Sequence, residues 1–383
     1  MGKRIVILGA GFGGLASCTA LRKQLGPEHS ILLIDRKRSF MMGLVNLWIL
    51  AGTRKLEESQ IPLRNLDSKG IDYLNDEVIR IDTASSSVHT TGHGEIKYDF
   101  LIVALGSDLA PERVPGFMGR GYNLYDALEV PKLRDRLMSF SKGEIAIVIM
   151  GMPYKCPPAP FEASMIIEHL LRNNGSRRNA SIDIYCPAPI ALPVAGAEVS
   201  SNLVEMLRER DINFHPLHKL ESVSDSELTF AGGTVKQYQV LVGIPPHKVP
   251  EVILKSGLAG PNGWVEVDKR TMRTHQNNVF AIGDVTEIKV TPALSVPKAG
   301  VFAEAQAKTV AQEIIEELSG AQIVSTFDGR GFCFMENGGM VAGMVEASFY
   351  DDPGPTVRLY PPSAHNYERK QEFERTRLSE WLL

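Results

Sequence analysis

Residues 4–14, RIVILGAGFGG, decide the fold, because they run from a short apolar strand directly into a glycine-rich turn. Three of the glycines, Gly9, Gly11 and Gly14, fit the pattern GxGxxG. In this pattern the first glycine permits a tight turn, the second lets the backbone approach a pyrophosphate, and the third lets helix and strand pack closely. A helical stretch, LASCTALRKQL, follows, so its amide groups and dipole are expected to face the phosphates.

A second strand completes this unit. Residues 31–34 are apolar and end on Asp35, 21 positions after Gly14 (35 − 14), where its carboxylate is placed to accept a hydrogen bond from a ribose hydroxyl. Strand, glycines, helix, strand and acid occur in order, which is more specific than GxGxxG alone but does not separate FAD from NAD. The residues expected to bind the dinucleotide here are Gly9, Gly11, Phe12, Gly13, Gly14, Asp35 and Arg36.

The composition is that of an ordinary folded protein. The chain has 383 residues, 44% hydrophobic and 22% charged, and this length predicts two or three domains. The formal net charge of −4 gives no support to a nucleic-acid partner or a polybasic membrane contact. The four cysteines form no CxxC and no zinc-binding spacing, so no metal site is expected. No signal peptide is visible and no run approaches the roughly 18 apolar residues of a membrane span, so a cytoplasmic location is expected.

Two distant segments indicate that the dinucleotide is FAD. Residues 99–106, DFLIVALG, are typical of a buried strand that ends in a glycine turn, and residues 279–285, VFAIGDV, are typical of another. Each alone is also compatible with an ordinary strand end. Together, and in this order, they resemble the further fingerprints of FAD-binding enzymes of the pyridine nucleotide-disulfide reductase type. The resemblance implies that Asp284 binds the ribityl chain of FAD, and it adds Ala104, Gly106 and Gly283 to the expected cofactor site.

These fingerprints imply an α/β fold of two Rossmann-like dinucleotide-binding domains, as in glutathione reductase-like enzymes, with a small C-terminal α+β domain. The FAD-binding domain is expected to be discontinuous and to comprise residues 1–110 and 250–320. Residues 111–249 would form the second Rossmann-like domain, which carries Cys156. Residues 321–383 would form the C-terminal domain, which covers the flavin and carries Cys333.

The second domain departs from a nicotinamide site at its first turn. The apolar strand 144–150, EIAIVIM, is followed not by GxGxxG but by residues 151–160, GMPYKCPPAP. The prolines lack amide donors, and the larger side chains would block the approach of a pyrophosphate. The sequence therefore predicts that the nicotinamide site is lost. Cys156 stands in its place, just ahead of a predicted helix, where the thiolate is expected to be favoured.

The segment around Cys156 resembles sulfide:quinone oxidoreductases and the flavoprotein subunit of flavocytochrome c sulfide dehydrogenases. The resemblance covers most of the chain and continues in VGIPPHKVP (242–250), GWVEVDKRT (263–271), VPKAGVFAEAQAKTVA (296–311) and GFCFMENGGMV (331–341). It implies a redox disulfide between Cys156 and Cys333 beside the flavin, which hydrosulfide opens. By the family pattern Cys156 takes the sulfur and Cys333 lies next to the flavin. The implied activity is oxidation of sulfide to sulfane sulfur or polysulfide, with electrons passed through FAD to quinone or cytochrome c.

Two charged residues have two open interpretations each. Glu162, six residues after Cys156, matches an acid of this family that would move protons near the disulfide, or it stabilises the helix start through the dipole. Lys298, in VPKAG, matches a family lysine near the flavin, or it is an ordinary surface lysine. The remaining thiols, Cys18 and Cys186, are interpreted as buried and structural.

Two further features concern the cofactor and the electron acceptor. Some flavocytochrome relatives anchor FAD through a cysteine in the segment that here reads SFMMGLVNLWILAG (39–52); it has none, so non-covalent FAD is expected. Quinone is favoured over a c-type cytochrome, because no haem site and no export signal are visible. The tail 369–383 gathers apolar residues on one side of a helix, which is expected either to dock on the protein or to contact a membrane peripherally. The apolar residues are Phe373, Leu378, Trp381 and Leu382, flanked by Arg369, Lys370, Arg375 and Arg377.

Two other functions stay open. One is an NAD(P)H-oxidising flavoprotein, such as a type II NADH dehydrogenase or a ferredoxin reductase-like enzyme, against which the missing second glycine motif counts. The other is a non-catalytic binding or assembly protein that FAD stabilises, against which the two candidate redox cysteines count.

Overall fold

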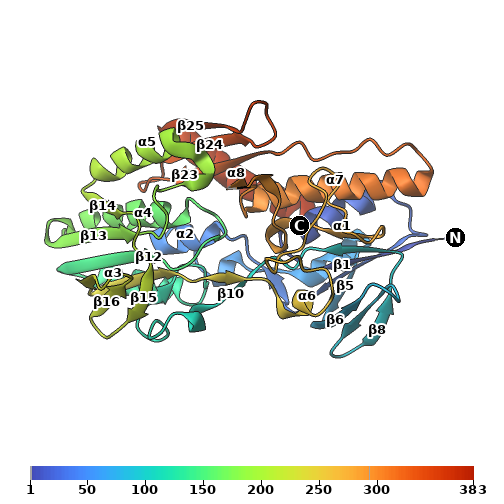
Figure 1. Ribbon diagram of the computed structural model, residues 1–383, viewed down its shortest axis with the longest axis horizontal. Coiled ribbons are helices and arrows are strands. Elements are labelled where there is room, and N and C mark those ends of the chain that lie inside the picture. Colours follow the sequence, from blue (N-terminus) through green and yellow to red (C-terminus); the bar gives the residue numbers. More distant parts are fainter. Residues whose placement is uncertain (1, 293) are drawn as a thin grey trace.

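The computed structural model describes residues 2–292 and 294–383 and is built around two parallel sheets, which lie toward opposite ends of its long axis (Figure 1). The predicted α/β class with Rossmann-like sheets is confirmed. The first sheet has the order β20-β9-β1-β2-β5, with all neighbouring strands parallel. Its strands are β1 (Arg4–Leu8), β2 (Ser30–Asp35), β5 (Asp72–Asn75), β9 (Phe100–Val103) and β20 (Val279–Ala281).

The first sheet is covered on both faces, which explains why β1 and β9 are continuous apolar runs. On one face α1 (Phe12–Gln24) packs against α7 (Gly300–Ser319), at the right of Figure 1. The other face packs against a three-stranded antiparallel sheet and a short helix. These elements are β6 (Val78–Asp82), β7 (Ser87–Thr90), β8 (Gly94–Lys97) and α6 (Glu251–Leu254).

The second sheet is also parallel, in the order β11-β18-β12-β13-β14. Its strands are β11 (Tyr122–Asn123), β12 (Gly143–Ile149), β13 (Ala180–Tyr185), β14 (Ile212–His215) and β18 (Val240–Ile244). Helices cover one face and a small antiparallel sheet covers the other. The helices are α2 (Val45–Ala51), α3 (Val130–Met138), α4 (Ala159–Asn173) and α5 (Gly196–Arg208), and the strands are β15 (Leu220–Val223), β16 (Glu227–Phe230) and β17 (Val235–Gln237). The expected domain boundaries near residues 110, 249 and 320 stay a prediction.

The C-terminal part is an antiparallel sheet followed by a helix, at the top of Figure 1. Its elements are β23 (Arg330–Glu336), β24 (Ala342–Ser348), β25 (Thr356–Ser363) and α8 (Ala364–Trp381). The Ser363 hydroxyl caps α8 by accepting a hydrogen bond from the Asn366 amide at 3.1 Å. Strand β23 contacts both α4 and α7, so this sheet bridges the two parallel-sheet units. Within the described residues, no helix has the length and apolarity needed to cross a bilayer.

Helix α8 docks on the protein through its apolar side, for which the sequence allowed either docking or membrane contact. Phe373, Trp381 and Leu382 are only 6%, 1% and 1% exposed. The Trp381 ring meets the Phe12 ring edge-on at 5.4 Å between centroids, and Phe373 stacks on the same ring at 6.3 Å. Lys370, expected as a cationic flank, is also buried. Of the two alternatives for this side, docking on the protein is therefore the one observed. A membrane contact through other parts of the tail stays a prediction.

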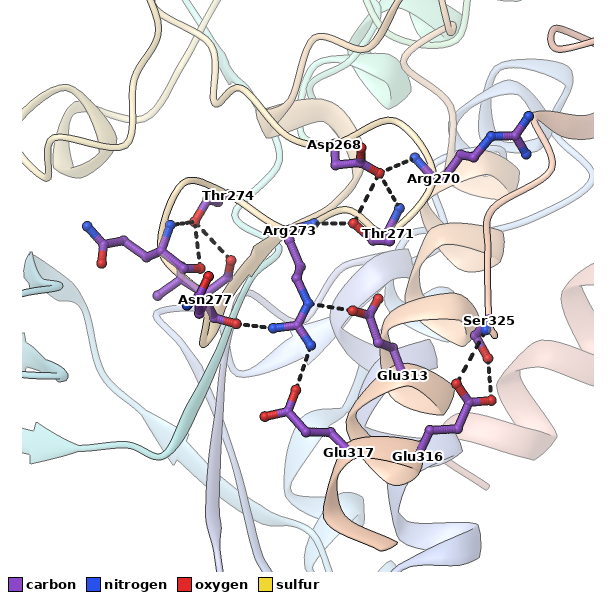
Figure 2. Close-up of polar contacts among 12 residues, drawn as sticks. Asp268, Arg270, Thr271, Arg273, Thr274, Asn277, Glu313, Glu316, Glu317 and Ser325 are labelled. Carbon is purple, nitrogen blue, oxygen red and sulfur yellow. Dashed lines mark hydrogen bonds and ion pairs between the residues drawn. The ribbon is translucent and has the colours of Figure 1, made fainter. Parts of the chain in front are cut away.

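An ionic cluster fixes the segment before β20 to α7 (Figure 2). The Arg273 guanidinium donates hydrogen bonds to the carboxylates of Glu313 and Glu317, the latter at 2.6 Å, and to the Asn277 carbonyl. Glu313 is almost fully buried, so its charge depends on this cation. The same guanidinium lies 4.7 Å from the ring centroid of Phe280 in β20. The cluster thereby fixes β20 relative to α7.

We expect Arg273→Ala to lower the free energy of unfolding by about 3 kcal/mol, because it leaves the buried Glu313 carboxylate without its cation. Urea unfolding followed by circular dichroism measures the change. Arg375→Ala is the matched control, because Arg375 pairs with Glu372 on the surface of α8, where the side chains are 73% and 53% exposed. Exposed pairs contribute roughly 0–1 kcal/mol. Equal losses in the two variants would contradict the role given to the Arg273 cluster.

Candidate active site

The glycine turn after β1 has the geometry of a phosphate-binding loop. Gly9 has φ +97°, and a Cβ there would lie 2.5 Å from the Ala104 carbonyl oxygen. A Cβ on Gly14 would lie 1.8 Å from the Gly9 carbonyl oxygen, so α1 crosses the turn where only hydrogen fits. A Cβ on Gly11 would meet no protein atom within 4 Å. The space over Gly11 is therefore open, as the approach of a pyrophosphate to the backbone requires.

Asp35 and Arg36, at the end of β2, lie beside this turn. The Asp35 carboxylate accepts hydrogen bonds from the amides of Ala10, at 2.6 Å, and Lys37, at 2.7 Å. It thus joins the glycine turn to the second strand. The Arg36 side chain is exposed and pairs weakly with Glu77 and Asp108, at 3.4 Å each. Their expected role toward the ribose stays a prediction.

The ends of β9 and β20 lie next to the turn, because both strands run parallel to β1. Ala104 and Gly106 follow β9, and Gly283 and Asp284 follow β20. No described residue donates a hydrogen bond to the Asp284 carboxylate, and its burial raises its pKa. A carboxylate in this position is free to accept hydrogen bonds from a bound polyol chain. The open space over Gly11 and the free Asp284 carboxylate therefore fit a dinucleotide such as FAD.

Lys298 is not a surface lysine. It is 7% exposed, and its ammonium donates hydrogen bonds to the carbonyls of Asp284, at 2.8 Å, and Thr286, at 2.7 Å. The ammonium also lies 3.5 Å from the ring centroid of Trp264. Burial lowers the pKa of Lys298 to about 8. The surface interpretation is wrong, and the role beside the flavin stays a prediction.

Cys156 sits in an unusual backbone conformation just before α4. Its φ is +51°, which few non-glycine residues adopt. Its amide donates to the Lys298 carbonyl at 2.7 Å, and its own carbonyl accepts from the Ala159 amide at 3.0 Å. Burial, together with the charge of Glu162 and of Cys333, raises the pKa of Cys156 well above its usual value. The expected preference for the thiolate is therefore wrong, because desolvation outweighs the helix dipole.

Cys333 lies in the middle of β23, opposite Val345 of β24. Burial, followed by the charge of Glu162, raises its pKa to about 12. The two cysteines are 177 positions apart in the sequence (333 − 156), yet the charges of Glu162 and Lys370 act on the pKa of both, and the charge of Cys333 acts on that of Cys156. Both are free thiols here. The fold thus brings them to one site, and their disulfide stays a prediction.

Glu162 is bound from two sides inside the protein. It is 1% exposed, and its Oε1 accepts hydrogen bonds from the Glu336 amide at 2.8 Å and from the Lys370 ammonium at 3.3 Å. These contacts reach β23 and α8, so a role limited to stabilising the start of α4 is wrong. Burial raises the pKa of Glu162, although the charge of Lys370 opposes this. A raised pKa suits a group that exchanges protons near neutral pH.

Several groups of this site are not evident from the sequence. Lys370 was taken for an exposed flank, although its spacing of three and eleven from Phe373 and Trp381 puts it on the same helix side. His247 was not singled out; its Nε2 accepts a hydrogen bond from the Lys155 amide at 3.4 Å and its Nδ1–H donates to the Pro245 carbonyl at 3.0 Å. Burial, together with the charge of Lys155, lowers the pKa of His247 to about 3. This histidine is therefore neutral.

An open apolar pocket lies beside Cys333. Its lining comes from the segments before α4, α5 and α7, the start of α7 and the C-terminal sheet, and it contains no charged side chain. Residues of the lining include Pro157, Pro158, Phe302, Phe332 and Phe349. The interpretation of Cys18 and Cys186 as buried thiols is confirmed, since both are at most 1% exposed. Within residues 2–292 and 294–383, no group of His, Cys, Asp and Glu is arranged to hold a metal ion.

The sequence pattern of the pyridine nucleotide-disulphide oxidoreductase family matches residues 3–152 and 162–309. The chain belongs to this family. It is an FAD-dependent oxidoreductase, as the glycine turn and the ends of β9 and β20 predicted. The two matched stretches leave out residues 153–161, which hold Cys156, and the C-terminal part, which holds Cys333. The two thiols thus lie outside what the family pattern describes.

Individual relatives are distant but cover most of the chain. The mitochondrial sulfide:quinone oxidoreductase of Mus musculus is 26% identical over 87% of this chain and 75% of its own length. The sulfide-quinone reductase of Aquifex aeolicus is 26% identical over 83% and 77%. The type II NADH:quinone oxidoreductase of Staphylococcus haemolyticus is 24% identical over 83% of both. The solved structure of the Aquifex aeolicus sulfide:quinone oxidoreductase shares the fold, with a TM-score of 0.87 at 23% identity over 98% of this chain and 90% of that chain.

Two glycine variants separate cofactor binding from folding. We expect Gly11→Val to fold and to lose FAD, because its side chain meets no protein atom but fills the space over the turn. Gly14→Val should fail to fold, since its Cβ would collide with the Gly9 carbonyl oxygen. The flavin absorbance per protein after purification, beside the circular dichroism spectrum, measures both. Full flavin in Gly11→Val would rule out this turn as the cofactor site.

Proposed function

We propose that this protein oxidises sulfide to sulfane sulfur through a Cys156–Cys333 disulfide and passes the electrons by way of FAD to a quinone. The observation that carries the proposal is the convergence of both thiols on the buried pair of Glu162 and Lys370. The names and coverage of the Mus musculus and Aquifex aeolicus relatives support the substrate and the acceptor. A c-type cytochrome as acceptor, non-covalent FAD and a cytoplasmic location stay predictions.

The proposed reaction begins at the sulfur of Cys156. Hydrosulfide attacks that sulfur in the disulfide, the S–S bond breaks, Cys156 keeps an added sulfur as a persulfide, and Cys333 leaves as a thiolate. A second hydrosulfide then removes the outer sulfur as a disulfane anion, and Cys156 returns as a thiol. The two cysteines re-form their disulfide with loss of one proton and two electrons. FAD, when bound at the glycine turn, supplies the two-electron acceptor.

The residues around the thiols suit these steps. Glu162, with its raised pKa, can take the proton that hydrogen sulfide releases on becoming hydrosulfide. The apolar pocket beside Cys333 can hold sulfur, because its lining carries no charge. The high thiol pKa values imply that a cation is needed to stabilise the Cys333 thiolate, and the ammonium of Lys370 lowers the pKa of both thiols.

The alternative, oxidation of NADH, is supported by the Staphylococcus haemolyticus relative. The start of α4, where a nicotinamide dinucleotide would place its pyrophosphate, argues against it. Positions 157, 158 and 160 are prolines, which have no amide hydrogen. Every other amide from 156 to 162 already donates to a carbonyl. The amide of residue 156 donates to the Lys298 carbonyl, that of 159 to the Cys156 carbonyl, and those of 161 and 162 to the Pro158 carbonyl. No backbone donor in this stretch is left for a phosphate.

We expect anaerobic sulfide, but not NADH, to bleach the flavin absorbance of the purified protein in a stopped-flow experiment. Cys156→Ser and Cys333→Ser should each slow bleaching by sulfide on the order of 10³-fold or more, because neither variant can form the bond that sulfide attacks. Cys186→Ser is the matched control and should react like the parent, since that buried thiol lies outside the site. Bleaching by NADH with no response to sulfide would instead favour the alternative. Short-chain quinone and cytochrome c, added in turn to the reduced protein, identify the acceptor.

A further inference from the structure

Three charged side chains from distant parts of the chain meet in the protein interior. Glu162 in α4, Glu336 in β23 and Lys370 in α8 are 1%, 3% and 2% exposed. The Lys370 ammonium lies 2.7 Å from Glu336 Oε2 and 3.3 Å from Glu162 Oε1. Glu162 and Lys370 are 208 positions apart. One cation therefore serves two carboxylates, and the cluster carries one net negative charge when all three groups are ionised.

Such a cluster is costly to bury unless its charges are used. Replacing buried ion pairs by apolar residues is often neutral or stabilising, so their presence is weak evidence of a purely structural role. Here the neighbours are the two thiols. The charge of Glu162 raises the pKa of both Cys156 and Cys333, whereas the charge of Lys370 lowers both. The balance within the cluster thus acts directly on the two sulfurs.

We propose that Lys370 is a positioning residue for the two-cysteine site: its ammonium holds Glu162 in place and supplies the positive charge that stabilises a thiolate at Cys156 or Cys333. This inference rests on the proposed function and assigns the charge balance of the same site to α8, a helix that is distant in the sequence from both cysteines. Lys370 does not itself react with sulfur in this scheme.

The two oxygens of Glu162 differ in a way that supports the assignment. Its Oε1 accepts hydrogen bonds from both the Lys370 ammonium and the Glu336 amide. No described residue donates a hydrogen bond to its Oε2. A proton taken up by Glu162 therefore belongs on Oε2, because Oε1 faces two donors. Lys370 in this way fixes which oxygen exchanges protons.

The position of Lys370 ties this charge balance to the docking of α8. Phe373 and Trp381 lie on the same side of the helix and pack on Phe12, so they place the ammonium. The Lys370 ammonium also lies 5.8 Å from the ring centroid of Trp48 in α2, which covers the cluster from another side. A shift of α8 would withdraw the cation from Glu162 and from the thiols together.

Other titratable groups face the cluster and enter any pH profile. Tyr125 precedes α3, and its pKa is raised by burial and then by the charges of Cys156, Tyr154 and Glu162. Tyr367 of α8 has its pKa raised by burial and by Glu336, while Lys370 opposes this. Both tyrosines stay neutral at pH 7–9, whereas Lys298, whose pKa is about 8 and whose carbonyl accepts the Cys156 amide, titrates within this range. The effect of the cluster is therefore taken from the difference between variants at one pH.

The test follows alkylation of the two thiols in the flavin-loaded protein. The protein is reduced with a phosphine and treated with iodoacetamide between pH 6 and pH 10, and Cys156 and Cys333 are read separately by mass spectrometry. Only the thiolate reacts, so the rate at a fixed pH reports the thiol pKa. We expect Lys370→Met to slow alkylation at pH 8 about tenfold, the equivalent of one pKa unit. Glu336→Gln should accelerate it several-fold, because the cation then serves a single carboxylate.

Three further variants make the outcome decisive. Lys370→Arg keeps the charge and should retain the parent profile, and the double variant Lys370→Met/Glu336→Gln should return toward it. Arg369→Met is the matched control, because Arg369 is the exposed neighbour on the same helix and its loss should change nothing. A merely structural role would move Lys370→Met and Glu336→Gln in the same direction, and that result would overturn the proposal, as would unchanged profiles in both. If Lys370→Met does not fold, Glu336→Gln and the double variant decide.

The alkylation assay uses neither sulfide nor quinone, so its result is independent of the proposed reaction. Opposite shifts in the two variants together with no bleaching by sulfide would contradict the proposed function and leave the charge role of Lys370 standing. Bleaching by sulfide with no shift in either variant would contradict the role of Lys370 alone.

Discussion

The close approach of α1 to the turn after β1 is the constraint on which the site depends. The Gly14 backbone comes so near the Gly9 carbonyl that no side chain fits between them. This contact sets the direction in which α1 leaves the sheet, and α1 in turn packs along α7. The segment leading into α7 carries Lys298, whose carbonyl accepts the amide of Cys156. A contact within the first fourteen residues thereby helps to place a thiol of the second parallel sheet unit.

The two sheet units share a topology but use their first turns differently. The turn after β1 keeps open space and a glycine backbone, which is what a phosphate needs. In the corresponding segment after β12, prolines replace some of the amide donors, and the remaining amides donate to carbonyls of the protein. The same position in the fold, a strand leading into a helix start, thus holds a nucleotide in one unit and presents a sulfur in the other. The change requires no new fold, because it exchanges backbone donors for one side chain.

How much the sequence could predict depends on the distance over which each signal acts. The glycine turn, Asp35 and the ends of β9 and β20 are local patterns, so the fold and the cofactor followed from them. The sequence left two partners open for the apolar side of the tail, because an apolar helix side indicates that something covers it but not what covers it. The thiolate expected at Cys156 was wrong because the local helix start competes with burial, which only the assembled structure contains. Lys370 and Glu336 could not be identified from the sequence, because their role depends on contacts between α8, β23 and α4, which are far apart in the chain.

The placement of Lys370 has a consequence for the order in which the site assembles during synthesis and folding. Helix α8 follows every other element of the described chain, so during synthesis the cation reaches the site after both cysteines and Glu162 have left the ribosome. Docking of α8 is therefore the step that completes the charge balance of the site, because it brings the ammonium to Glu162 and Glu336.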